Sequence, residues 1–358
     1  MKIIRLTTFL NFGGVEKRLI NISNVKDSNE WIFYAINKGG TAAEQIKKQN
    51  KQVVCLDLTY KIPKISTIYK LYQVFKREKP DVVHTSGAEA NFHGVIAAKL
   101  AGVRVVVAEE IGIPSQGFLA KKIFQVIYQM ADFAVGNSKL VTRFLRDMNG
   151  VADTKLVLIP NPMIFPDLPA IKKTIEAEFN IISVSRLEPV KNIESVLRAV
   201  SRLIADGIKI NYTIIGDGAS ADLLKNLVLS LGIENNIIFA GFHTDPYPFL
   251  LKSDLYVLTS FSEGFSNSLM EAMFSGIPSL STKVGAAGEI IDDGINGWLV
   301  EPDDDDDLLK KLKFILQLTE EERAQIGVLG KKTITDNYSL QNHIDLLMQM
   351  YLNNKDVV

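Results

Sequence analysis

Short apolar runs alternate along the chain with longer stretches that have the spacing of helices. In the first half the apolar runs read "MKIIRL", "WIFYAI", "QVVCLDL", "DVVHTS", "RVVVAE", "FAVGNS" and "KLVLIP". Between them, "TIYKLYQVFKREKP", "NFHGVIAAKLAG" and "LAKKIFQVIYQMA" have apolar positions at helical spacing. The apolar runs do not alternate with polar residues, which is typical of strands covered by helices on both faces of a parallel sheet.

A second set of the same kind follows the stretch "PNPMIFPDLPAIKKTIEAEF". Its four prolines interrupt regular structure, and we interpret it as a linker. After it come "FNIISVS", "KINYTIIG", "NIIFAGF", "LYVLTS" and "IPSLST", again with helical patterns between them. The sequence therefore predicts an α/β fold with two Rossmann-like, doubly wound domains, residues 1–165 and 176–338.

Composition and charge narrow the class of protein. The 358 residues are 47% hydrophobic and 23% charged, as in ordinary globular proteins. A single cysteine and a start without a leader-like pattern lead us to expect a cytoplasmic compartment. Residues 1–170 hold 23 Lys and Arg against 14 Asp and Glu, whereas the remainder holds 17 against 27. The basic half favours an anionic partner, such as acidic lipid or a phosphorylated substrate, although an uneven solvated surface explains it equally well.

Several charged residues and glycines directly follow predicted strands, where open parallel sheets bind their ligands. Arg186 and Lys191, in "SRLEPVKN", are two cations beside a helix start, an arrangement suited to a diphosphate. Taken alone, they are explained at least as well as ordinary surface cations. Gly13 and Gly14, in "NFGGVEK", and Gly216, in "YTIIGDG", would let backbone N–H groups approach a phosphate. The first pair fits neither the dinucleotide fingerprint nor the Walker A loop, and a plain tight turn remains an alternative.

The stretch "EGFSNSLMEAM" sets Glu263 and Glu271 on either side of a helix start. If the helix begins near Ser266 to Ser268, Glu263 faces a ligand at its mouth and Glu271 stands one turn inside. The alternative is a capping box, with Ser268 as N-cap and Glu271 as the third helical residue. Together, the cations, glycine loops and carboxylates predict a nucleotide-sugar site in a crevice between the domains.

At this point the chain resembles the family-4 retaining glycosyltransferases with the GT-B fold and an E-x7-E element. The resemblance covers nearly the whole sequence, through "FGGVEK", "PDVVHTSG", "VGNSKLV", "IPNP", "VSRLEPVKN", "IIGDG", "FAGF" and "EGFSNSLMEAMFSGIPSLSTKVGAAGEIIDDGINGWLV". It also implies a last helix, within residues 339–358, that crosses back to the first domain.

Residue roles follow from this resemblance. Arg186 and Lys191 would neutralise the leaving diphosphate, Glu263 would hold hydroxyls of the donor sugar, and Glu271 would accept hydrogen bonds from the ribose. Gly13 and Gly14 would border donor and acceptor. The remaining donor-binding positions implied are Gly216, Gly241, Phe242, Phe265, Ser266, Asn267, Ser268 and Leu269.

One departure from the family pattern concerns the position after the fifth strand. Many relatives carry a histidine there, whereas this chain reads "VVVAEEIGIPS", with Glu110 at the aligned position. A carboxylate can still orient the acceptor or the sugar, but the family role of a neutral imidazole is in doubt. His84, which ends a strand, is a second candidate for a role at the acceptor, and a structural histidine is the alternative.

The resemblance implies a retaining, metal-independent transferase that moves a sugar from a UDP- or GDP-sugar to a hydroxyl acceptor in polysaccharide or glycolipid biosynthesis. We expect no cofactor and no nucleic-acid partner. We also expect no metal, because Arg186 and Lys191 would supply the positive charge. The aspartate run 303–307 is interpreted as a helix start. A non-hydrolysing nucleotide-sugar epimerase and a non-catalytic nucleotide-sugar-binding protein are the alternatives.

A membrane contact is a further hypothesis. The stretch "FLAKKIFQVIYQM", residues 118–130, sets Lys121 and Lys122 next to apolar residues, as in a helix at a membrane interface. With a lipid-linked sugar as acceptor, the protein would lie at the inner face of the membrane. A helix that faces the core of the first domain is the alternative.

Overall fold

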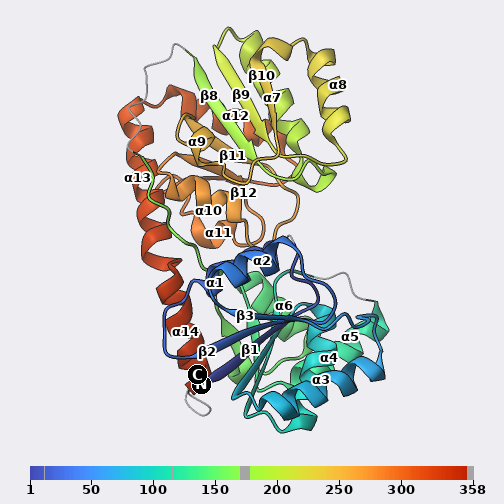
Figure 1. The fold of residues 1–358 in the computed structure, drawn as a ribbon. Helices are drawn as coiled ribbons and strands as arrows, with labels where there is room; N and C mark the ends of the chain where they lie inside the picture. Colours follow the sequence, from blue (N-terminus) through green and yellow to red (C-terminus); the bar gives the residue numbers. More distant parts are fainter. Residues whose placement is uncertain (12, 114–116, 170–177, 353–358) are drawn as a thin grey trace. The chain divides into compact units, whose positions relative to one another are not determined.

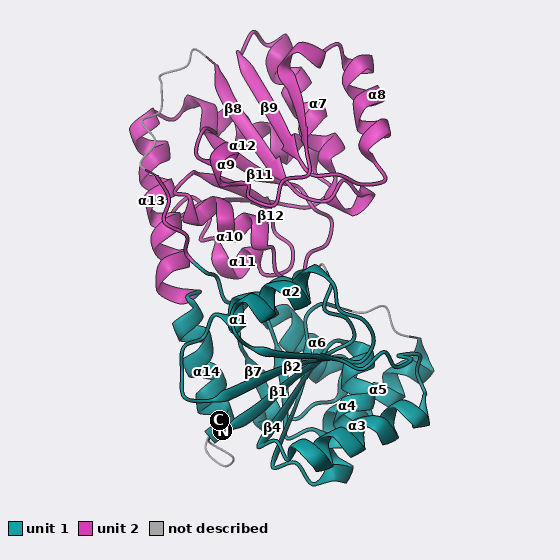
Figure 2. Ribbon diagram, in the orientation of Figure 1, with its two compact units in different colours: residues 1–164, 338–358 teal, residues 165–337 magenta. Residues whose placement is uncertain are grey.

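The computed structural model of the chain describes residues 1–11, 13–113, 117–169 and 178–352. It divides into two compact units, which Figure 2 colours separately. Unit 1 consists of residues 1–164 and 338–358, and unit 2 of residues 165–337. The chain therefore leaves unit 1, forms unit 2 and returns to unit 1 with its last helix, α14 (Leu340–Leu352).

Unit 1 is built on a seven-stranded sheet in the order β3-β2-β1-β4-β5-β6-β7, with every pair of neighbours parallel. The strands are short and continuously apolar because both faces of the sheet are covered. They are β1 (Lys2–Thr7), β2 (Glu30–Ala35), β3 (Gln52–Cys55), β4 (Val82–Ser86), β5 (Val105–Glu110), β6 (Phe133–Gly136) and β7 (Leu156–Leu158).

Two groups of helices bury the two faces of this sheet (Figure 1). One face packs against α1 (Gly14–Ser23), α2 (Thr41–Lys48) and α14. The other packs against α3 (Ile65–Glu78), α4 (Ala88–Ala101), α5 (Phe118–Met130) and α6 (Lys139–Asn149). A short 3-10 helix, η1 (Asp153–Lys155), precedes β7.

Unit 2 repeats the plan with six parallel strands in the order β10-β9-β8-β11-β12-β13. They are β8 (Phe179–Val184), β9 (Ile210–Ile215), β10 (Ile237–Gly241), β11 (Leu255–Leu258), β12 (Ser279–Thr282) and β13 (Trp298–Val300). One face packs against α7 (Ile193–Ala205), α8 (Ala221–Leu231) and α12 (Asp305–Gln317). The other helices are α9 (Tyr247–Leu250), α10 (Asn267–Phe274), α11 (Ala287–Ile290), α13 (Glu320–Asn337), η2 (Pro189–Lys191) and η3 (Glu234–Asn236).

The predicted fold class is confirmed, and every apolar run named from the sequence contains a strand. The sequence pattern missed β13, although β7, which is equally short, lies within the run "KLVLIP". The aspartate run does begin a helix: Asp304 is the N-cap of α12, and its carboxylate accepts a hydrogen bond from the N–H of Asp307 at 2.8 Å. Of the expected linker, residues 170–177 lie outside the described residues.

Candidate active site

The order of strands in unit 2 marks one place where a ligand is expected. From β8 the chain moves outward to β9 and β10, then returns to form β11 on the other side of β8. Loops at the carboxyl ends of β8 and β11 therefore diverge, and the space between diverging loops is where doubly wound sheets bind ligands. Lys191, on η2, follows β8, and Glu263 follows β11.

Lys191 and Glu263 form an ion pair at this topological switch point, the place where the strand order reverses. The Nζ atom of Lys191 lies 2.6 Å from Oε1 of Glu263, and each side chain is 13% exposed. The hydroxyl of Ser260 donates a hydrogen bond to the same Oε1 at 2.7 Å. One carboxylate oxygen thus binds both an ammonium and a buried hydroxyl, which fixes the orientation of the carboxylate.

Hydrogen bonds from backbone N–H groups and threonine hydroxyls to backbone carbonyls hold the loops after β8, β11 and β12 together. The sequence joins strand ends to helix starts by short polar segments, and their backbone groups must find partners when buried. In this unit the groups of one loop hydrogen-bond to those of the next. The bonds run from Phe261 N to Val190 O (2.8 Å), from Thr259 Oγ1 to Asn192 O (2.8 Å), from Thr282 Oγ1 to Ser260 O (2.7 Å) and from Ala286 N to Gly264 O (3.0 Å).

Arg186 lies on the same loop as Lys191 but in a different environment. Its side chain is 69% exposed, and Nη1 donates to Oε1 of Glu188 at 2.7 Å. The two expected cations therefore differ: Lys191 is held by Glu263, whereas Arg186 extends into solvent.

Helix α10 begins beside Glu263, and its N-cap is Ser266. The Ser266 hydroxyl accepts a hydrogen bond from the N–H of Leu269 at 3.3 Å. The capping box with Ser268 as N-cap is therefore wrong; Ser268 lies inside the helix, and its hydroxyl accepts a hydrogen bond from Tyr256 at 2.9 Å. The helix start carries a partial positive charge that favours an anion. Glu271, one turn inside, is 9% exposed.

The glycines after β9 have a packing reason that the sequence alone did not reveal. Gly216 has φ of 141°, and a Cβ there would lie 1.8 Å from the carbonyl oxygen of Ser185 on the loop that carries Arg186. Its N–H donates to the carbonyl of Gly241 at 2.9 Å, which links the ends of β9 and β10. Phe242, next along the chain, is 56% exposed.

Gly13 and Gly14 follow β1, which lies beside β4 at the corresponding switch point of unit 1. Gly13 is the N-cap of α1 and has an extended backbone. A Cβ on Gly14 would meet no described atom within 4 Å. Packing within unit 1 therefore gives no reason for a glycine at this position.

His84 lies in a buried polar cluster and not at the surface. It is fully buried on β4, together with Arg5 of β1, Arg18 of α1, Glu109 of β5 and Tyr351 of α14. Arg18 forms a two-pronged ion pair with Glu109, and Nη2 of Arg5 lies 3.0 Å from the same carboxylate.

The protonation of His84 follows from its partners. Arg5 can only donate, so Nδ1 of His84, 3.0 Å from Nη1 of Arg5, is the acceptor and the ring is neutral. Burial and the neighbouring guanidinium of Arg5 lower the pKa of His84 to about 3. A fully buried side chain cannot touch an acceptor, so the structure favours the structural alternative for His84.

Glu110 lies on the opposite face of the sheet from Glu109. It is 5% exposed, accepts a hydrogen bond from the hydroxyl of Tyr128 at 2.8 Å, and accepts another from the N–H of Ile111 at 3.1 Å. Burial raises the pKa of this carboxyl to about 7. Glu110 can therefore be protonated or ionised at neutral pH, as a histidine can.

Sequence reasoning missed Ser260 and Thr282, which hold the site of unit 2 together, and the buried polar cluster around Glu109 in unit 1. Serine and threonine near strand ends are too common to be singled out. Arg5 did carry a signal, because a charged residue inside the apolar run "MKIIRL" is unusual for a buried strand.

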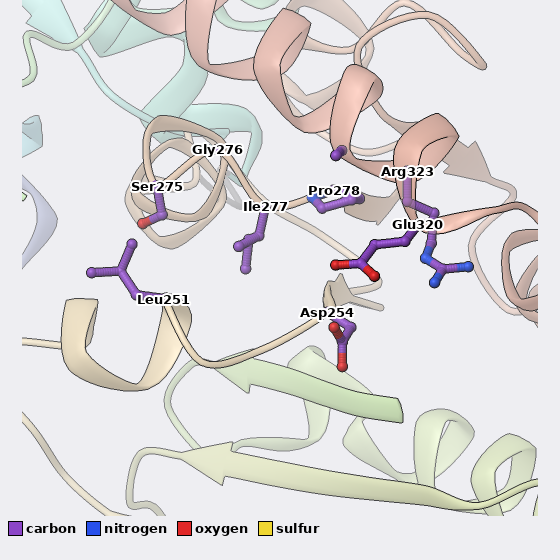
Figure 3. Close-up of a pocket in the computed structure, with 9 residues that line it drawn as sticks. Leu251, Asp254, Ser275, Gly276, Ile277, Pro278, Glu320 and Arg323 are labelled. Atoms are coloured by element: carbon purple, nitrogen blue, oxygen red, sulfur yellow. The ribbon is translucent and has the colours of Figure 1, made fainter. Parts of the chain in front are cut away.

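A separate cavity of about 240 Å³ lies in unit 2 at the amino-terminal ends of β11 and β12 (Figure 3). It is bounded by Asp254 and Pro278, which directly precede β11 and β12, and by Glu320 and Arg323 at the start of α13. These positions are at the amino ends of the strands, so this cavity is distinct from the site at Lys191 and Glu263. Within the described residues, no group of three or more His, Cys, Asp or Glu side chains is placed to hold a metal ion.

Comparison with known proteins assigns the family. Residues 12–163 match the family described as Glycosyltransferase Family 4, and residues 166–333 match Glycosyl transferases group 1. The chain belongs to the family-4 glycosyltransferases. A relative in Escherichia coli, UDP-Gal:alpha-D-GlcNAc-diphosphoundecaprenol alpha-1,3-galactosyltransferase, is 26% identical over 81% of this chain and 80% of its own length.

A further relative supports this assignment, and a solved structure shows the fold. A Campylobacter jejuni alpha-1,4-N-acetyl-D-galactosaminyltransferase, named for an undecaprenol-linked diphosphate substrate, is 27% identical over 88% of this chain and 89% of its own length. HepE of Anabaena, solved in complex with UDP, has a TM-score of 0.84 at 20% identity over 99% of this chain and 100% of its own, which shows the shared GT-B fold. Other relatives match over about half of their own length. The glycosyltransferase assignment leaves the epimerase and the binding-protein alternatives without support.

Proposed function

We propose that this glycosyltransferase moves a sugar from a UDP-sugar to a hydroxyl of a lipid-linked sugar, with retention of anomeric configuration and without a metal ion. The observation that carries the proposal is the Lys191–Glu263 pair at the switch point of unit 2, beside the start of α10. It sets a cation, a carboxylate and a helix N-terminus next to one another. The cation and the helix N-terminus suit a diphosphate, and the carboxylate suits the hydroxyls of a sugar.

The charges that develop in the reaction assign the roles. As the bond between the anomeric carbon and the phosphate oxygen breaks, negative charge grows on the diphosphate. Lys191, Arg186 and the first-turn N–H groups of α10 would stabilise it, and loss of one such donor costs roughly 3–4 kcal/mol in other enzymes. Because Leu269 N–H already donates to Ser266, the earlier N–H groups of the segment 265–269 are the better candidates. Glu263 would bind hydroxyls of the sugar, and Glu271 the ribose.

We propose UDP as the nucleotide because the descriptions of two relatives contain it. HepE is described with UDP, and the Escherichia coli relative is named for UDP-Gal. At unit 2, the exposed ring of Phe242 after β10 would stack beside the base, next to the backbone of Gly241. The open space at Gly14 in unit 1 would admit a ligand close to the backbone.

Metal independence and retention are parts of the same proposal. Two cations and a helix start would supply the positive charge that a divalent ion supplies elsewhere. Turnover should therefore persist in excess EDTA, and the anomeric configuration of the product, measured by NMR, should equal that of the donor. Loss of turnover in EDTA would contradict metal independence. Inversion of the anomeric configuration would contradict retention.

We propose that the acceptor binds at unit 1. Glu110, with its pKa near neutrality, would accept a hydrogen bond from an acceptor hydroxyl or donate one to it. The named substrates of the two relatives include diphosphoundecaprenol lipids, which makes a lipid-linked sugar the acceptor class that we propose.

Contact with a membrane would bring this acceptor to the enzyme. No helix among the described residues is long and apolar enough to cross a bilayer. On α5, Phe124 and Ile127 are buried in the core, so the core-facing alternative is correct for that side of the helix. Phe118, Leu119 and Val126, by contrast, are 79%, 73% and 55% exposed. With the neighbouring Lys121 and Lys122, they would hold the protein to an anionic surface. Absence of flotation with anionic vesicles would remove this part.

A binding experiment tests the central proposal. In a thermal-shift screen of UDP, GDP, ADP and their sugars, UDP compounds should stabilise the protein most, since a ligand at 100 times its Kd adds about 2.7 kcal/mol. Lys191→Ala should lose this response. Lys225→Ala, which removes an exposed lysine on α8, is the matched control. A full UDP response in Lys191→Ala would overturn the proposed site.

A further inference from the structure

Ser260 is a buried residue of the loop after β11 to which the proposed reaction gives no role. Its side chain is fully buried, and its backbone carbonyl accepts a hydrogen bond from the hydroxyl of Thr282 at 2.7 Å. Thr282 is the last residue of β12 and is itself 2% exposed. Ser260 is therefore fixed from the neighbouring strand, independently of any ligand.

The hydroxyl of Ser260 and the ammonium of Lys191 share one oxygen of Glu263. The distances to Oε1 are 2.7 Å and 2.6 Å. These two partners differ in rigidity. Serine has a single side-chain torsion and is buried, whereas lysine carries its charge on a flexible four-carbon stem. When an anion arrives, the ammonium can turn toward it, but the serine hydroxyl stays where the backbone puts it.

We propose that Ser260 is a positioning residue that keeps Oε1 of Glu263 in place while Lys191 turns to the diphosphate, so that the carboxylate continues to face the donor sugar. The inference rests on the proposed function of Lys191 and Glu263. It concerns the sugar part of the donor and not the nucleotide, and this difference makes it testable.

The test compares the binding of a nucleotide with that of its sugar derivatives. Titration calorimetry would measure Kd for UDP and for UDP-glucose, UDP-galactose and UDP-N-acetylglucosamine, with the wild type and with Ser260→Ala. For the sugar that the wild type binds most tightly, Ser260→Ala should raise Kd at least fivefold. Its Kd for UDP should stay within twofold of wild type, because Lys191 and α10 remain.

Two further variants separate positioning from a general effect on the loop. Ser262→Ala removes an exposed serine two residues away and should leave both constants unchanged. Ser260→Cys keeps a side chain of similar size with a weaker donor, and should give an intermediate Kd for the sugar derivative. A purely structural role would weaken UDP and the UDP-sugar equally.

The outcomes are distinct. Equal weakening of both ligands by Ser260→Ala, or no weakening of the UDP-sugar, overturns the inference. Failure of the proposed function shows itself elsewhere, in a wild type that no nucleotide stabilises or in a Lys191→Ala variant that binds UDP normally.

Discussion

The hydroxyl of Tyr351 lies 2.6 Å from Nδ1 of His84, although 267 positions separate the two residues in the chain. Tyr351 belongs to α14 and His84 to β4, the strand beside the first. Because Arg5 makes Nδ1 an acceptor, the tyrosine hydroxyl is the donor. A polar contact inside the core thus fixes the last helix to unit 1.

Tyr351→Phe should weaken this attachment. The variant keeps the ring but removes one of the two donors to Nδ1 of His84, the other being Arg5, and the loss of one hydrogen bond costs about 0.5–1.5 kcal/mol. Urea unfolding should show this loss, and hydrogen exchange should show it first in α14. Tyr69→Phe, on an exposed tyrosine of α3, should change neither. Unchanged exchange in α14 of the Tyr351 variant would mean that this hydrogen bond contributes little to the attachment of the helix.

Glu110 should make unit 1 less stable as the pH rises from about 4.5 to about 7. Its pKa in the folded protein is raised to about 7, so in this interval the folded state holds a proton that the unfolded state has lost. The difference corresponds to about 3 kcal/mol. Glu110→Gln should abolish this decrease, so the variant gains stability relative to wild type at pH 8 and not at pH 4.5.

The measurement is the difference in unfolding free energy between wild type and variant across the pH range. His84 and His343 contribute in the opposite sense, because their pKa values are lowered to about 3 and folded stability is lost as the pH falls below 6.5. Subtracting the two proteins removes this contribution. A difference that does not vary between pH 4.5 and 7 would contradict the raised pKa.

Lys191 and Arg186 should differ in their effect on turnover. Lys191→Ala removes a largely buried cation that is already oriented by Glu263, so kcat/KM should fall roughly 10²–10³-fold. Arg186→Ala removes an exposed guanidinium that first has to leave Glu188, so its loss should be smaller. Initial rates with saturating acceptor would establish the order. The reverse order would mean that the arginine makes the principal contact with the leaving group.

Gly216→Ala should impair both stability and donor binding. Its Cβ would lie 1.8 Å from the carbonyl of Ser185, and that backbone cannot move without moving the loop that carries Arg186 and Lys191. We expect a loss of about 1–3 kcal/mol and weaker UDP binding. Gly288→Ala, where the nearest atom is 3.7 Å away, is the control. Unchanged UDP affinity in the Gly216 variant would mean that Gly216 does not influence the donor site.

The sequence by itself determined the strands other than β13, the two-unit plan and the positions at which ligands are expected. Continuous apolar runs are a local property of the chain, and the carboxyl-edge rule for parallel sheets needs only the order of elements. Lys191 and Glu263 were selected in this way, and the structure brings the two side chains together. The family resemblance added roles that no spacing contains.

Only the tertiary structure decided which of those residues touch and which groups hold them. Ser266 and not Ser268 caps α10, because capping depends on backbone angles at the helix start, and both serines fit the sequence rule. Glu109 and Glu110 are adjacent in sequence, yet one is ionised between two guanidinium groups and the other has a pKa near neutrality. Successive strand residues face opposite sides of a sheet, so Glu109 meets Arg5 of β1 and Arg18 of α1, whereas Glu110 meets Tyr128 of α5. A pKa or an ion pair is set by such neighbours, and a linear sequence does not name them.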